Sequence, residues 1–128
     1  MEYLLDTHTF LWMAANPSRL SQEVRELVLD ESRELHLSAA SGWEIAILDR
    51  LKRVELPDVP QRFVPEAMQR LRVSPVPISF HTAISSAMLP PIHRDPFDRI
   101  IVAEAMKKKM TVLTKDSMFA EYDVLVLW

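Results

Sequence analysis

Short apolar runs that end at polar residues alternate with longer segments of helical periodicity along this chain. The strand-like runs read EYLL (2–5), LHLS (35–38), PVPIS (75–79), MTVLT (110–114) and DVLVLW (123–128). Helices are predicted between them by apolar residues spaced three and four apart, over 7–15, 21–31, 40–53, 64–72, 80–89 and from Asp98 onward. The prolines at 57–65, 75–77 and 90–91 predict loops. This alternation favours an α/β fold whose mainly parallel central sheet is covered by helices on both faces.

Composition limits the classes of function. The chain has 128 residues, 48% of them apolar, so we expect one hydrophobic core and a single domain over residues 1–128. It has neither a long apolar run nor a charged-then-apolar leader, so we expect a cytoplasmic protein without a membrane anchor. The single glycine, Gly42, excludes glycine-rich phosphate loops, and the absence of cysteine excludes thiolate metal ligands. The net charge of −3 argues against a basic surface that coats nucleic acid but allows a nucleic-acid enzyme with an acidic pocket.

Four acids stand at positions that a solvated surface does not explain. Asp6 directly follows the first strand, and Asp116 follows the strand at 110–114, so both lie at the carboxyl ends of parallel strands, where ligands bind in open sheets. Glu44 and Asp98 lie early in their helices and share the apolar, inward-facing side of each. Both helices are expected to begin at that same edge of the sheet. The sequence therefore predicts one pocket that contains Asp6, Glu44, Asp98 and Asp116.

Repulsion between these carboxylates indicates what such a pocket needs. Two carboxylates about 5 Å apart repel by roughly 3 kcal/mol at an effective dielectric constant of about 20. Four acids make several such pairs, against a total stability of roughly 5 to 15 kcal/mol. Either protons or cations therefore enter the pocket, or the acids are not together. A site built from carboxylates selects Mg²⁺ or Mn²⁺. The chemistry that suits this site is phosphodiester hydrolysis by a metal-activated water.

Polar residues beside the four acids have two possible roles each. Asp95 has the residue type and position of a helix cap, with support of a neighbouring metal ligand as its second possible role. Arg99 and Lys115 are candidates to bind the scissile phosphate or to offset the repulsion between the acids. Thr7 and Thr114 either hydrogen-bond a metal ligand or water, or act as caps and strand ends. We expect the four histidines to be structural and the three tryptophans to be core residues.

Four segments together resemble the PIN-domain nucleases, in particular the VapC-like toxin branch of toxin–antitoxin systems. They read LLDTHTFLW, LSAASGWEIAI, HRDPFDRIIVAEA and VLTKDSMFAEYDVLVLW, in the family's order and nearly from end to end of the chain. The resemblance implies a three-layer α/β/α sandwich and an endoribonuclease that depends on Mg²⁺ or Mn²⁺. It also implies a cognate antitoxin as partner and a homodimer. The family's acidic positions fall on Asp6, Glu44, Asp98 and Asp116.

Two other functions compete with a metal-dependent ribonuclease. A phospho-acceptor domain of the response-regulator kind would need paired acids after the first strand and an aspartate that ends a central strand, and here only Asp6 follows EYLL. A PIN-fold binding protein that has lost catalysis is the second alternative. The presence of all four acids argues against it.

Overall fold

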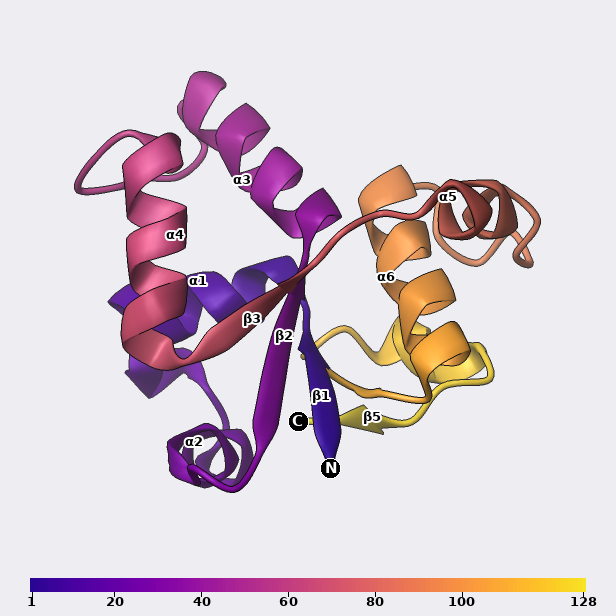
Figure 1. The fold of residues 1–128 in the computed structure, drawn as a ribbon, viewed down its shortest axis with the longest axis horizontal. Coiled ribbons are helices and arrows are strands. Elements are labelled where there is room, and N and C mark those ends of the chain that lie inside the picture. The colour runs from indigo at the N-terminus through magenta and orange to yellow at the C-terminus, as the bar shows by residue number, and fades with distance from the viewer.

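The protein folds around a five-stranded sheet in which every pair of neighbouring strands is parallel. The computed structural model describes residues 1–128 (Figure 1). The strands are β1 (Glu2–Leu5), β2 (Glu34–Ser38), β3 (Val73–Val76), β4 (Thr111–Leu113) and β5 (Val126–Leu127), in the spatial order β3-β2-β1-β4-β5. The helices are α1 (Thr7–Ala15), α2 (Gln22–Leu29), α3 (Ala39–Arg50), α4 (Pro60–Leu71), α5 (Phe80–Ala87) and α6 (Pro96–Lys108). Two 3₁₀ turns are added, η1 (Pro17–Arg19) and η2 (Ser117–Glu121).

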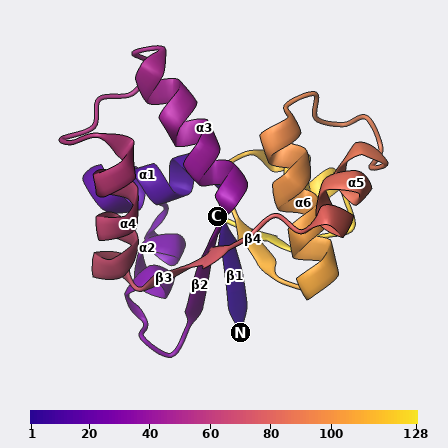
Figure 2. The same ribbon diagram turned by 45° about the horizontal axis from the view of Figure 1, so that its top comes forward.

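Two hydrophobic cores lie on opposite faces of the sheet, and β1 contributes to both. Tyr3 and Leu5 point into the core that α1, α2 and α4 cover, whereas Leu4 points into the core that α6 and η2 cover. This follows from the two-residue period of a strand, which sends successive side chains to opposite faces. Helices α1, α2 and α4 accordingly lie on one side of the sheet, and α5 and α6 lie on the other (Figures 1 and 2). The predicted three-layer α/β/α architecture is confirmed.

The prolines account for the main error in the predicted elements. A loop was expected over residues 57–65, but α4 begins at Pro60 and contains Pro65. Proline is favoured at the first helical position because the N–H that it lacks has no intrahelical partner there. Pro65 is exposed, so the backbone carbonyl that it leaves unpaired lies on the water side of the helix. Pro75 lies within β3, which is an edge strand and therefore tolerates the missing donor.

The carboxyl edge of the sheet is where α1 and α3 begin. Asp6 is the only residue between β1 and α1, and Ser38, the last residue of β2, caps α3. Helix α6 runs back toward the start of β4, so that its first turn lies at the same edge as the first turns of α3 (Figure 2). The elements that carry the four predicted acids therefore meet at this edge. No helix of the structure combines the length and apolar character that a membrane crossing requires.

Candidate active site

The structure places the four predicted acids on four separate elements around the carboxyl edge of the sheet. Asp6 caps α1, Glu44 lies in the second turn of α3, Asp98 lies in the first turn of α6, and Asp116 caps η2. All four side chains are at least partly buried. The charges of Asp6, Glu44 and Asp116 each raise the pKa of Asp98, so the four carboxylates are close enough to repel one another.

Asp6 is held by hydrogen bonds from both sides of the strand pair β1–β4. The backbone N–H of Thr7 donates to its Oδ1 (2.8 Å), and the hydroxyl of Thr114 donates to its Oδ2 (2.7 Å). The Thr114 hydroxyl in turn accepts a hydrogen bond from the backbone N–H of Asp116 (3.0 Å). Burial raises the pKa of Asp6, and these hydrogen bonds act in the opposite direction. Thr114 thus links two of the four acids and holds one of them directly, which is one of the two roles that its sequence position indicated.

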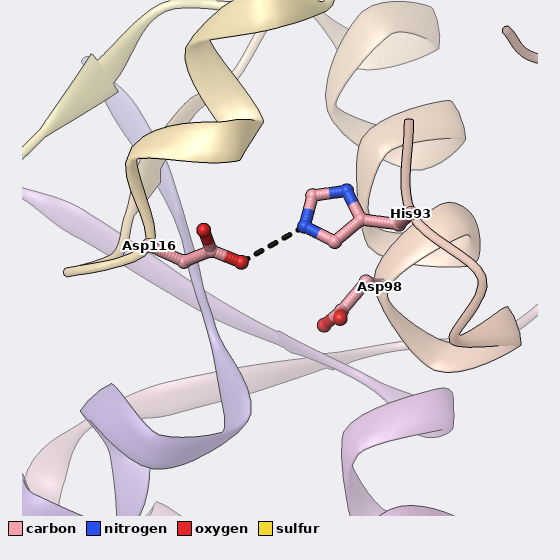
Figure 3. A group of neighbouring side chains, drawn as sticks. All are labelled: His93, Asp98 and Asp116. Atoms are coloured by element: carbon pink, nitrogen blue, oxygen red, sulfur yellow. Dashed lines mark hydrogen bonds and ion pairs between the residues drawn. The ribbon is translucent and has the colours of Figure 1, made fainter. Parts of the chain in front are cut away.

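The pKa of Asp98 is strongly raised. Burial, followed by the charges of Asp6, Asp95, Glu44 and Asp116, raises it from 3.8 to about 8. Its carboxylate points toward the space between His93 and Asp116 (Figure 3). One ligand atom from each of these three side chains lies within 4.8 Å of the other two. At neutral pH Asp98 therefore holds a proton, which relieves its repulsion with the neighbouring carboxylates. A bound cation would relieve the same repulsion.

Glu44 carries a polar atom without a partner. Its Oε1 is buried and has no hydrogen bond, although an unpaired buried carboxylate oxygen is costly. Burial raises the pKa of Glu44, and the charges of Asp95 and Asp6 raise it further. An orphaned oxygen among repelling carboxylates fits a hard divalent cation, whose preferred ligands are carboxylate oxygens. The residues present are therefore suited to a hard divalent cation, and would also accept protons.

The residues beside the four acids make different contacts, which distinguish between their predicted roles. Asp95 is the N-cap of α6, as predicted, and its Oδ1 accepts a hydrogen bond from the backbone N–H of Phe97 (2.8 Å). Arg99 does not point to a free phosphate position, because its guanidinium donates to four backbone carbonyls of the loop between α5 and α6. The hydroxyl of Thr7 donates to Ser41, which joins α1 to α3 (2.9 Å). Lys115 is exposed beside Asp116 and free of any protein partner.

Two residues differ from their predicted roles. Trp43 was expected in the core, but 57% of it is exposed, and its ring packs edge-on against Phe97 with 4.9 Å between ring centroids. It occupies the rim of the site, one position before Glu44. His93 is buried as a structural histidine would be, yet its partner is one of the four acids, since its Nε2 lies 2.8 Å from Oδ2 of Asp116 (Figure 3). The signal for this role was its place at the start of the HRDPFDR segment.

Comparison with known proteins gives one family and one fold. The family model described as PIN domain matches residues 3–125. The chain is 31% identical over 114 residues to Ribonuclease VapC22 of Mycobacterium tuberculosis, which covers 88% of this chain and 85% of that protein.

Solved structures of similar fold include complexes with DNA. VapBC2 from Rickettsia felis, bound to a DNA fragment from its promoter, has a chain that superposes with a TM-score of 0.72 at 14% identity and covers 99% of this chain and 98% of its own. DNA-bound VapBC from Salmonella typhimurium gives a TM-score of 0.68 at 19% identity, with 99% and 97% covered. At these identities the likeness establishes the fold alone.

Proposed function

This chain belongs to the PIN domain family, and on that premise we propose that Asp6, Glu44, Asp98 and Asp116 hold Mg²⁺ or Mn²⁺ in an endoribonuclease site. The chain is a VapC-like ribonuclease and the toxin of a toxin–antitoxin pair, in line with its likeness to Ribonuclease VapC22. The observation that carries the proposed site is the convergence of four carboxylates on one sheet edge, with the pKa of Asp98 raised to about 8. We place its activity in the cytoplasm and assign residues 1–128 to one PIN domain.

Each residue of the proposed site has a defined task. When bound, the divalent cation supplies an acidified water and neutralises charge on the phosphodiester. Asp98 of α6 and Asp116 at the start of η2 would provide carboxylate oxygens to the cation, as would Asp6 at the start of α1 and Glu44 of α3. Thr114 keeps one oxygen of Asp6 turned toward β4 and leaves its remaining lone pairs available.

Burial of the site supports its use in hydrolysis. The half-buried carboxylates lie in surroundings of low dielectric constant, where charge–charge interactions are stronger than in water. Because the four carboxylates repel the phosphate as well as one another, RNA cleavage requires that cations be bound first. Lys115 is the cation that the chain itself exposes beside Asp116, and we keep it as a phosphate-binding candidate.

A groove away from the acids offers a surface for the antitoxin. This groove, of about 620 Å³, lies at the amino edge of the sheet, opposite the acids, and its walls include Leu20, Leu29, Leu35 and Leu71. Leu29 lines this groove and is 76% exposed although it is apolar. We propose that an apolar segment of the antitoxin docks here. We also propose that the protein forms a homodimer, which the family resemblance implies.

The experiment that tests the nuclease is digestion of cellular RNA by purified protein free of antitoxin. Reactions contain Mg²⁺, Mn²⁺ or EDTA, and parallel reactions use Asp98→Asn. Glu55→Gln, which removes one exposed acid outside the site, is the matched control. We expect discrete new RNA ends with either metal, and none with EDTA or with Asp98→Asn. Folded protein that leaves the RNA intact under both metals would favour the binding-only alternative.

A further inference from the structure

His93 lies on a loop and yet is 7% exposed, with both ring nitrogens bound. Its Nε2 lies 2.8 Å from Oδ2 of Asp116, and its Nδ1 lies 3.0 Å from the hydroxyl of Tyr122. Its ring also packs against that of Phe119, with 4.7 Å between centroids. The loop that carries it is fastened by Arg99, whose guanidinium binds the backbone carbonyls of Ala87, Leu89, Pro90 and His93. The orientation of the imidazole is therefore fixed from several directions.

The carboxylate of Asp116 only accepts hydrogen bonds, so Nε2 of His93 carries the hydrogen between them and Nδ1 faces the hydroxyl of Tyr122. This hydroxyl accepts a hydrogen bond from the backbone N–H of His93 (2.9 Å), so its own hydrogen remains free to donate to Nδ1. A neutral imidazole whose Nδ1 accepts must carry its hydrogen on Nε2. Nε2–H then donates to Oδ2 of Asp116. The chain of contacts runs from the backbone through Tyr122 and His93 to the carboxylate.

Asp116 is thereby held at both oxygens. Its Oδ1 accepts from the backbone N–H of Met118 (2.9 Å), and its Oδ2 accepts from His93. Each oxygen keeps a further lone pair. The oxygen that binds His93 lies on the side of the carboxylate that faces Asp98 (Figure 3). We propose that His93 is a positioning residue, which turns the Asp116 carboxylate toward the cation site through its Nε2–H and is itself oriented by Tyr122. This inference rests on the proposed metal site.

The contacts argue against His93 as a metal ligand in its own right. Ligand atoms of Asp98 and Asp116 lie within 4.8 Å of one of its ring nitrogens, but Nε2 is taken by Asp116 and Nδ1 by Tyr122. Coordination through either nitrogen would break one of these bonds and leave a buried polar group unpaired. A histidine between a carboxylate ligand and a second hydrogen-bonding group is instead typical of outer contacts that orient a metal ligand.

The test measures Mn²⁺ affinity by electron paramagnetic resonance in wild-type protein and in four variants. His93→Phe keeps a ring against Phe119 and removes both nitrogens, whereas His93→Gln restores an N–H donor. Asp116→Asn and the double variant His93→Phe/Asp116→Asn complete a cycle. We expect His93→Phe to weaken Mn²⁺ binding by about 10- to 100-fold. His93→Gln should recover most of this loss, and the double variant should bind like Asp116→Asn alone.

The other outcomes overturn the inference in distinguishable ways. Unchanged Mn²⁺ affinity in folded His93→Phe would make the histidine merely structural, and a double variant that binds much more weakly than Asp116→Asn would make it an independent ligand. Wild-type protein that binds no Mn²⁺ would instead overturn the proposed metal site itself. Thermal melting checks that each variant is folded. If His93→Phe does not fold, two other variants test the inference. We then expect His93→Gln to retain Mn²⁺ binding and Tyr122→Phe to bind Mn²⁺ more weakly.

Discussion

Replacing Asp98 by asparagine should stabilise the metal-free protein in alkaline but not in acidic solution. The Asp98 carboxyl keeps its proton up to pH about 8 in the native state, whereas in the unfolded chain the carboxyl loses its proton near pH 3.8. Between these values the native state binds a proton that the unfolded state lacks, so the stability of the wild type falls as pH rises through this window. Asparagine resembles the protonated acid and does not titrate. The two proteins should therefore be equally stable near pH 4 and diverge toward pH 8.

The size of the difference follows from the shift. About four pKa units at 1.36 kcal/mol each give an upper limit of roughly 6 kcal/mol. Asp98 is only partly buried, so solvent screening reduces this, and we expect about 2 to 3 kcal/mol at pH 8. In a domain of this size that corresponds to a rise in melting temperature of about 10 °C.

The assay is thermal unfolding in EDTA from pH 4 to pH 8, followed by circular dichroism, with Glu55→Gln as control. Added Mg²⁺ should raise the melting temperature of the wild type by binding the native state, and should raise that of Asp98→Asn less. An advantage of Asp98→Asn that is the same at both ends of the pH range would refute the reasoning, because it would not come from the proton. An undiminished response to Mg²⁺ in the variant would remove Asp98 from the metal site.

Three further substitutions test separate parts of the structure. Gly42→Ala should raise the free energy of unfolding by about 1 kcal/mol, because Gly42 lies within α3 and a Cβ there meets no atom within 4 Å; urea denaturation measures it. Asp95→Ala should be about 1 kcal/mol less stable than Asp95→Asn by the same assay, since asparagine keeps the cap of α6 while both remove the charge. Leu29→Glu should weaken the antitoxin complex in calorimetry and spare RNA cleavage, and unchanged affinity would move the docking surface elsewhere.

The positions of the four acids could be predicted from the sequence better than the contacts of the residues around them. Asp6 and Asp116 could be predicted from sequence because the carboxyl ends of parallel strands meet at one edge of a sheet, whatever side chains lie between them. Glu44 and Asp98 could be predicted because each lies on the apolar face of its helix, where a carboxylate requires a partner. The start of α4 was missed because proline forbids a helix interior but suits a helix start, and sequence alone did not distinguish the two at Pro60.

The role of His93 required coordinates. Its partners, Asp116 and Tyr122, lie 23 and 29 positions further along the chain, and no local spacing relates them. Arg99 shows the same limit, because its guanidinium serves backbone carbonyls, which every residue possesses and which therefore leave no signal in the sequence. Trp43 was misjudged for a third reason. Apolar runs predict burial on average, and at the rim of a site one aromatic ring remains exposed.

The hydrogen bond from Thr114 to Asp6 spans 108 positions of the chain, so it can form only late during synthesis. A ribosome releases β1 early, but β4, which pairs with it, follows only after some 110 residues. Until then the growing chain presents at most Asp6, Glu44 and Asp98, without the carboxylate and the threonine that complete the edge. With the site proposed here, a chain must therefore be translated to a late stage before it can cut RNA.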